Sequence, residues 1–123
     1  MMKIDILPML VTQVSLVENN GQVPSDEHPN TFSLNASVLF DEDKNTVAKL
    51  VANAELVSIG KYEVNVVAEF VLHFDAPMTE ESVTGAVSDS KTEETVFPYV
   101  ASYINAFVAL SGYQRPNIPI VTF

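Results

Sequence analysis

The sequence predicts an α+β fold in which a four-stranded antiparallel sheet packs against one long C-terminal helix. Two observations carry this prediction. Several segments before residue 75 alternate apolar and polar residues with the period of two that is typical of half-buried strands. A later segment, Thr95–Tyr113, has no charged residue and follows the period of a helix. The length of 123 residues fits one domain, so residues 1–123 are expected to form a single unit.

Three consecutive segments have the clearest strand pattern. Thr31–Phe40, Val47–Ile59 and Tyr62–Phe74 each place alternate apolar residues on one face. Short turns separate them, at residues 41–45 (DEDKN) and at Gly60, where glycine readily takes a positive φ. Strands joined by such turns form an antiparallel meander.

The first segment, Ile4–Val17, predicts a fourth strand that is apolar on both faces. One face carries Ile4, Ile6, Leu10, Val14 and Leu16, and the other carries Leu7, Met9, Val11 and Val17. The second face is more apolar than a solvated strand requires. Pro8 has no N–H to donate, so it predicts an edge position or a bulge.

Between the last strand and the long helix, residues 75–94 are polar. Met78–Val87 is consistent with a short helix capped by Thr79, because threonine side chains satisfy free N–H groups at helix starts. A mobile loop is the alternative for this segment.

Thr95–Tyr113 predicts a helix that is apolar on nearly all sides. Thr95 is the expected N-cap, which puts Pro98 in the first turn, and Gly112 is the expected C-terminal stop. One face carries Phe97, Val100, Ile104, Phe107 and Val108, and a second carries Tyr99, Tyr103, Ala106 and Leu110. One sheet covers only one side of a helix. The second face is therefore expected to contact a partner subunit or a ligand, and a homo-oligomer is the simpler account.

The charge balance excludes some classes of partner. The 16 acidic and 6 basic residues give a net charge of −10, which disfavours nucleic acid and anionic membranes. Basic or unfolded polypeptides would be attracted. There is no cysteine, the first ten residues do not resemble a signal peptide, and the longest apolar stretch is too polar to span a membrane. We expect a cytoplasmic protein without membrane insertion.

Few residues suggest catalysis. His73 and Asp75 form a His-x-Asp pair, but two ligands are too few for a zinc site. Glu63 and Glu69 share a strand face about 20 Å apart, too far for a glycosidase-type carboxylate pair. His28 lies in a polar loop, and no glycine-rich phosphate-binding pattern occurs. We therefore predict a protein that is not an enzyme and has no cofactor or metal.

The order of elements and two short motifs carry a family resemblance. The helix opens with Val96–Tyr99 (VFPY), and a proline-bearing tail with Pro116–Ile120 (PNIPI) follows it. This arrangement resembles the SecB protein-export chaperone and its small SecB-like relatives, whose main helix also begins with Phe-Pro-Tyr. The resemblance covers most of the chain in pattern, and about Val96–Phe123 in residue identity.

The resemblance implies subunits that pair into dimers, and dimers that pack through their long helices into tetramers. It also implies apolar grooves that hold unfolded polypeptides without ATP, for delivery to SecA in SecB and for protection of antitoxins in some relatives. Leu7, Met9 and Val11 are then expected to form part of the peptide-binding groove. The expected oligomer interface is the second helix face, with Tyr99, Tyr103, Ala106 and Leu110. SecB continues with a further helix and a tail that contacts SecA. The sequence ends at Phe123 without their counterpart, so whether the resemblance extends to a contact with SecA stays open.

Three functions remain open at this point. The leading hypothesis is a non-enzymatic SecB-like chaperone or binding protein that holds extended apolar segments. The second is a structural or adaptor protein with the same fold that binds one specific partner. The third is a small-molecule enzyme, which would require a pocket with converging polar groups.

Overall fold

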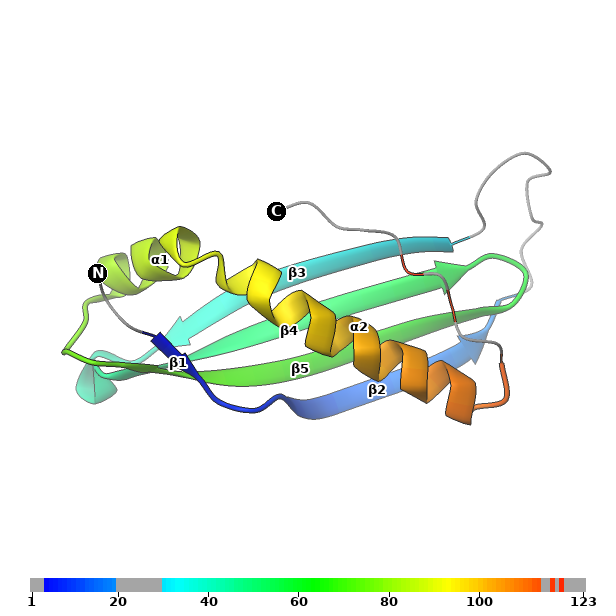
Figure 1. Ribbon diagram of the computed structural model, residues 1–123, viewed down its shortest axis with the longest axis horizontal. Helices are drawn as coiled ribbons and strands as arrows, with labels where there is room; N and C mark the ends of the chain where they lie inside the picture. Colours follow the sequence, from blue (N-terminus) through cyan, green and yellow to red (C-terminus); the bar gives the residue numbers. More distant parts are fainter. Residues whose placement is uncertain (1–3, 20–29, 114–115, 117, 119–123) are drawn as a thin grey trace.

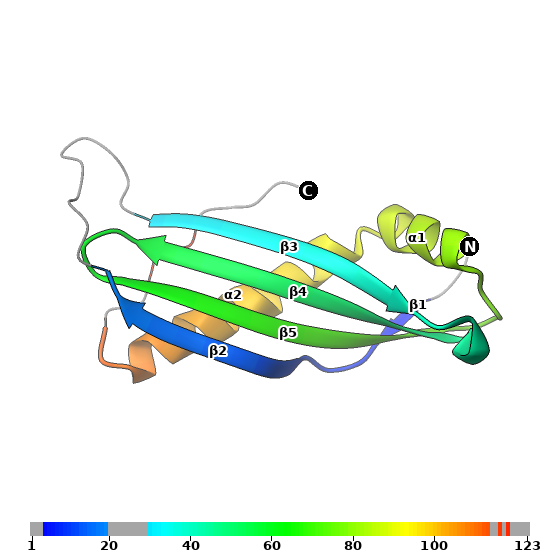
Figure 2. The ribbon, with the colours of Figure 1, turned by 180° about the vertical axis from the view of Figure 1, so that it is seen from behind.

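The computed structural model describes residues 4–19, 30–113, 116 and 118, which form one antiparallel sheet with two helices on one face (Figures 1 and 2). The elements in chain order are β1 (Ile4–Ile6), β2 (Leu10–Glu18), β3 (Asn30–Phe40), a 3-10 turn (Glu42–Lys44), β4 (Val47–Ser58), β5 (Tyr62–Phe74), α1 (Glu80–Asp89) and α2 (Thr92–Leu110). The predicted α+β architecture is confirmed. The sheet has five strands because the predicted first strand is divided in two.

The predicted meander forms the centre of the sheet. The strand order is β1-β5-β4-β3, and β2 also pairs with β5. β4 pairs with β5 along its whole length, from Val47↔His73 to Ser58↔Tyr62, and with β3 from Ala48↔Phe40 to Ser58↔Asn30. Gly60 takes a φ of 83° in the turn between β4 and β5, as its predicted role requires.

The edge position and irregularity that the sequence predicted at Pro8 are both present, and in addition the strand is divided there into β1 and β2. Ile6 pairs with Leu72 and Leu10 with Glu69, so three residues of the first strand face only two of β5. A second irregularity follows between Val11 and Gln13. These two shifts move Leu10 onto the open face of the sheet, where it is 61% exposed. The prediction that Leu10 shares a face with Val14 and Leu16 is therefore wrong, because inserted residues reverse the alternation.

The core lies between α2 and the sheet. Along α2 the fully buried residues recur every fourth position, at Val96, Val100, Ile104 and Val108. The sheet opposes them with buried leucines and valines of β4 and β5. Ala36, Ala52 and Ala68 are cross-strand neighbours on three adjacent strands, and their small side chains leave room on the covered face. Phe97 is half-buried at the margin and packs edge-on against Phe32, with ring centroids 5.6 Å apart.

The long helix begins earlier than predicted. α2 starts at Thr92, and the residue before it is Lys91, which has left-handed backbone angles. Thr95 is thus not the N-cap; its N–H and hydroxyl both donate to the Lys91 carbonyl, at 3.2 and 3.3 Å. Pro98 lies inside the helix rather than in its first turn. Glu93 and Glu94 occupy the first turn instead. Their negative charges stabilise the helix there because they lie near the positive end of its dipole.

The other helix ends follow their sequence signals. Thr79 caps α1 in a capping box with Ser82, which confirms the short helix predicted there. After α2, Gly112 takes a φ of 98°, and the N–H groups of Gly112 and Tyr113 donate to Ala109 and Val108. This is the left-handed C-terminal stop predicted for Gly112.

Candidate functional site

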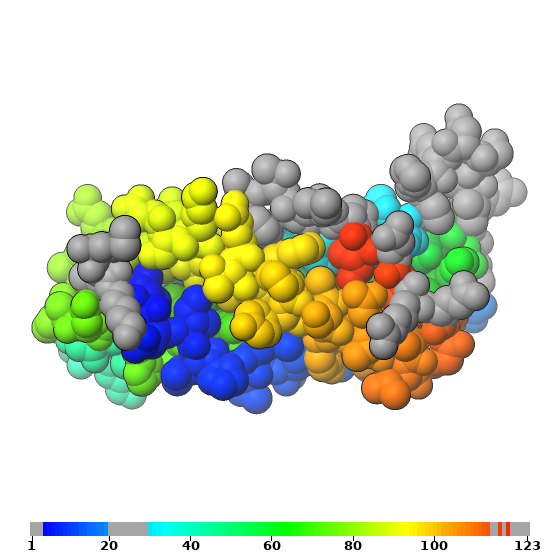
Figure 3. Space-filling model, viewed as in Figure 1, coloured from blue at the N-terminus to red at the C-terminus, as the bar shows by residue number. Residues whose placement is uncertain are grey.

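An open apolar groove lies between the N-terminal strand segment and the start of α2. It is lined by residues 4–9, by Phe70 of β5 and by Thr95, Val96 and Tyr99 of α2, and its volume is about 450 Å³. In Figure 3 the blue N-terminal segment and the yellow first part of α2 lie side by side on this face. We refer to this feature as the β1–α2 groove. Its size is that of a pocket for one or two large side chains.

The break at Pro8 creates one wall of the groove. Because proline cannot donate a ladder hydrogen bond, the chain leaves the sheet between β1 and β2. Leu7 keeps one bond to β5, from its N–H to the Val71 carbonyl at 2.9 Å. This bond holds the segment close to the sheet while Leu7 stays 38% exposed and Met9 stays half-buried. The wall is therefore fixed in place and apolar.

The remaining walls come from the core and from α2. Phe70 and Val96 are 2% and 0% exposed, so they present only a small part of their surface at the base of the groove. Tyr99 is 61% exposed and stands at the rim. Asp5 is the one carboxylate among the lining residues. An apolar side chain entering here would contact mostly carbon atoms.

Of the three residues predicted for peptide binding, two line the groove and one does not. Leu7 and Met9 both line the groove. Val11 does not; it is half-buried, pairs with Ala68 and packs against the core. The sequence also did not indicate that Phe70 or Tyr99 would join the groove. Phe70 belonged to the predicted core face of its strand and Tyr99 to the predicted interface.

The predicted oligomer face of α2 is largely uncovered in the single chain. Tyr99 is 61% exposed, Leu110 is 88% exposed and Ala106 is also exposed. Tyr103 is half-buried and stacks on Phe107, with ring centroids 6.1 Å apart. Three of the four residues thus present apolar surface to the outside.

Glu69 and His73, two of the groups that the sequence analysis considered for catalysis or metal binding, do not line this groove. Glu69 forms an ion pair with Lys49 at 3.4 Å on the open face of the sheet. His73 is exposed on β5, and His28 lies outside the described residues. Within residues 4–19, 30–113, 116 and 118, no three His, Cys, Asp or Glu side chains are grouped closely enough to hold a metal ion. No helix in the same part of the chain is both long and apolar enough to cross a membrane.

The fold has known counterparts although the sequence has no close ones. No protein-family model matches the chain, and no curated protein matches it. Among solved structures, the Mycobacterium tuberculosis Rv1957 SecB-like chaperone, in complex with a ChAD peptide from the Rv1956 HigA1 antitoxin, matches with a TM-score of 0.74. That match has 11% identity and covers 97% of this chain and 88% of the chaperone.

The chain has the SecB-like fold. The resemblance that the sequence suggested is therefore confirmed at the level of the fold. A protein of unknown function from Streptococcus agalactiae also matches, with a TM-score of 0.51, 10% identity, and coverage of 98% of this chain and 99% of that one. Within the SecB-like fold, the β1–α2 groove lies beside the long helix, and the exposed face of that helix runs from Tyr99 to Leu110.

Proposed function

We propose that this protein is a non-enzymatic SecB-like binding protein that holds extended apolar segments of polypeptides in the β1–α2 groove. The observation that carries the proposal is the exposed apolar wall formed by Leu7 and Met9 opposite Tyr99. Methionine suits a surface that accepts different apolar side chains, because its thioether chain is flexible and polarisable. The SecB-like chaperone of the same fold, which holds an antitoxin peptide, supports a polypeptide as the ligand.

The energetics favour several grooves acting together. Burying one large apolar side chain contributes about 1.5–3 kcal/mol. One or two such side chains contribute at most about 6 kcal/mol, which only reaches the low end of the roughly 4–15 kcal/mol lost on association, so a single groove would bind weakly. Grooves repeated in an oligomer would hold different parts of one long client and raise the overall affinity. We therefore propose a homo-oligomer, a dimer or a tetramer, that is built through the exposed face of α2.

The chaperone activity is tested by the aggregation of a chemically denatured client diluted into buffer. The protein at stoichiometric amounts is expected to suppress light scattering by the client. The double variant Leu7→Ser/Met9→Ser is expected to lose most of this effect, because it places hydroxyls in the apolar wall. Leu10→Ser is the matched control: Leu10 is more exposed, at 61%, and lies on the opposite face of the sheet.

Two results would count against the proposal. If the unaltered protein suppresses aggregation of none of several clients, the holding function is wrong. If Leu10→Ser loses as much activity as the double variant, the β1–α2 groove is not the binding site.

The oligomer is tested by light scattering of the purified protein. We expect a dimer or tetramer, and we expect Leu110→Glu to shift the protein toward a monomer because it adds charge to an 88% exposed apolar position. A monomer at all concentrations would contradict this part of the proposal.

A further inference from the structure

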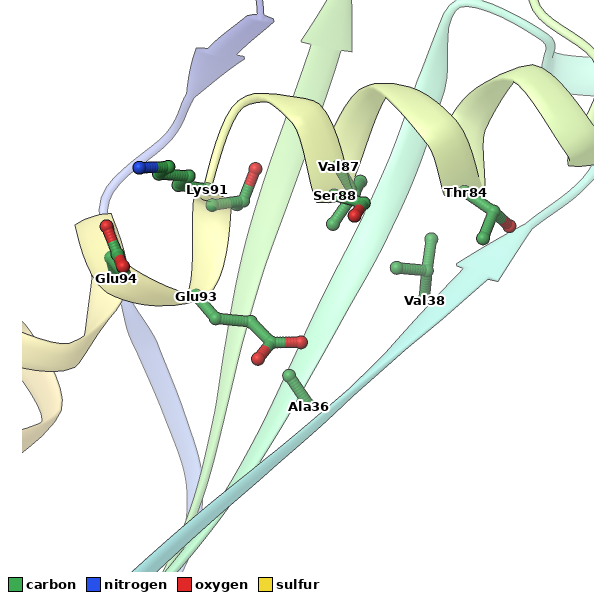
Figure 4. A pocket seen from close by; sticks show the side chains of 9 residues that line it. Ala36, Val38, Thr84, Val87, Ser88, Lys91, Glu93 and Glu94 are labelled. Carbon is green, nitrogen blue, oxygen red and sulfur yellow. The ribbon is translucent and has the colours of Figure 1, made fainter. Parts of the chain in front are cut away.

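A second hollow lies at the junction of α1 and α2, beside β3. It has a volume of about 580 Å³ and is lined by Ala36 and Val38 of β3, by α1 and by the first turn of α2 (Figure 4). We refer to it as the elbow hollow. It shares no lining residue with the β1–α2 groove. The apolar side chains of β3 lie on one side of it and polar side chains of the helix junction lie on the other.

Two carboxylates, those of Glu93 and Glu94, and one cationic side chain, Lys91, line the elbow hollow. Figure 4 shows the Glu93 carboxylate beside Ala36, whereas the amino group of Lys91 points away from Ala36 and Val38. Glu93 is half-buried and makes no hydrogen bond or ion pair with any residue that the structure describes. A carboxylate next to apolar surface favours the approach of a positive charge, because screening by water is reduced there.

A buried hydroxyl in the same lining also lacks a partner. Thr92 is 1% exposed, and within the described part of the chain its Oγ1 has no hydrogen-bond partner. Buried hydroxyls are normally paired, so this one marks the helix junction as a place where the described residues leave a polar group unsatisfied. Because the hydroxyl is enclosed, the acceptor that an incoming side chain can reach here is the Glu93 carboxylate. An ammonium group carries three donors and no acceptor, which complements a carboxylate.

The edge of β3, the strand beside the elbow hollow, can also bind the backbone of a peptide. Among the described strands β3 pairs only with β4, so its other side is an edge. Its eleven residues, NTFSLNASVLF, include no charge and no proline. Such an edge accepts an added extended strand through main-chain hydrogen bonds. A peptide lying there would place alternate side chains toward Ala36 and Val38.

We infer that the elbow hollow receives a basic side chain of an extended polypeptide. The inference rests on the proposed function, because the bound polypeptide is the same client, and it adds a charge preference that the apolar groove lacks. The client would carry an apolar residue for the β1–α2 groove and a lysine or arginine for the hollow. The first turns of α2 separate the two sites, and a helix is about 10–12 Å across, so at least about four extended residues would lie between them.

The test uses two short fluorescein-labelled peptides with the same apolar sequence. One carries lysines at positions where the other carries norleucine, and fluorescence anisotropy measures the dissociation constants at low ionic strength. We expect the lysine peptide to bind at least about threefold more tightly. Glu93→Gln is expected to abolish this preference and to leave the norleucine peptide unaffected. The matched control is Glu81→Gln, since Glu81 occupies the same position in the first turn of α1 but lies outside the hollow.

The outcomes separate the two proposals. If both peptides bind equally well, the inference about the hollow is overturned and the groove function stands. The inference is likewise overturned if Glu81→Gln weakens lysine binding as much as Glu93→Gln, because net charge alone would then explain it. If the lysine peptide binds, and this binding survives Leu7→Ser/Met9→Ser but is removed by Glu93→Gln, the hollow stands and the apolar groove function is wrong. If neither peptide binds, both proposals fail.

Discussion

Leucines are buried in the centre of the sheet and exposed at its periphery. In β4 and β5, Leu50, Leu56 and Leu72 are all 0% exposed, and pairing runs without a shift along both strands. At the periphery, Leu7 and Leu10 are 38% and 61% exposed, and the strand that carries them is broken. The contrast indicates that stability is concentrated in the centre. Both candidate binding features lie where the regular structure is interrupted.

The interruptions have a physical cause in each case. At the first strand, Pro8 removes a hydrogen-bond donor and opens the β1–α2 groove. At the helix junction, Lys91 takes left-handed backbone angles and Thr92 buries a hydroxyl that has no partner among the described residues. Such features cost free energy, and they persist because the regular centre of the fold is stable enough to hold them.

The largest effect is expected from a cavity in the centre. Leu50→Ala should lower the free energy of unfolding by about 2–5 kcal/mol, because a fully buried side chain is removed from a tightly packed site. Leu10→Ala, on the exposed face, should change it by less than about 0.5 kcal/mol. Urea denaturation of both variants measures the difference. Similar losses for the two leucines would contradict the concentration of stability in the centre.

At the helix junction a stabilising change is expected. Thr92→Val keeps the shape of the side chain and removes the unpaired buried hydroxyl, so the free energy of unfolding should rise by about 1 kcal/mol. Thr92→Ser keeps the hydroxyl and removes a buried methyl group, so it should be destabilising. The midpoints of urea unfolding distinguish these cases. A loss of stability in Thr92→Val would mean that the hydroxyl has a partner.

Lys91→Gly should also stabilise the junction, by up to about 1 kcal/mol, because glycine takes left-handed angles without the steric cost of a Cβ atom. Lys91 has a φ of 51°. The neighbouring Ser90 has an ordinary φ of −83°, so Ser90→Gly should be neutral or destabilising. Thermal unfolding of the two glycine variants compares them directly. Equal effects would show that the left-handed conformation of Lys91 is not strained.

The smallest effect is expected at the end of the core, in alkaline solution. Burial raises the pKa of the Tyr62 phenol above its usual value of 10.0, and nearby Tyr113 raises it further, while the hydrogen bond with Ser58 opposes the shift. Above pH 10.0 the unfolded chain loses this proton before the folded chain does, so stability should fall as the pH rises. Tyr62→Phe should reduce that fall. Urea midpoints at neutral pH and above pH 10 measure it, and an unchanged alkaline fall in the variant would exclude Tyr62 as the cause.

The sequence by itself determined the elements of the fold and their order. Alternation with a period of two located β3, β4 and β5 to within a residue or two, since one face of each strand must be apolar to be buried. Proline and glycine signals placed the edge irregularity at Pro8 and the end of the long helix near Gly112. The Phe-Pro-Tyr motif supported the SecB-like resemblance, and the structural match confirms that fold.

Only the tertiary structure decided the register and the composition of the sites. The extra residue between Ile6 and Leu10 reverses the alternation and places Val11 opposite Ala68 of the core, away from the groove that Leu7 and Met9 line, and strand pairing rather than local pattern fixes such shifts. The start of α2 moved to Thr92 because the chain turns at Lys91 after α1, which overrode the capping preference of Thr95. Leu7 and Tyr99 line one groove although more than ninety residues separate them along the chain. Periodicity describes neighbours within one element, whereas a groove forms where distant elements meet.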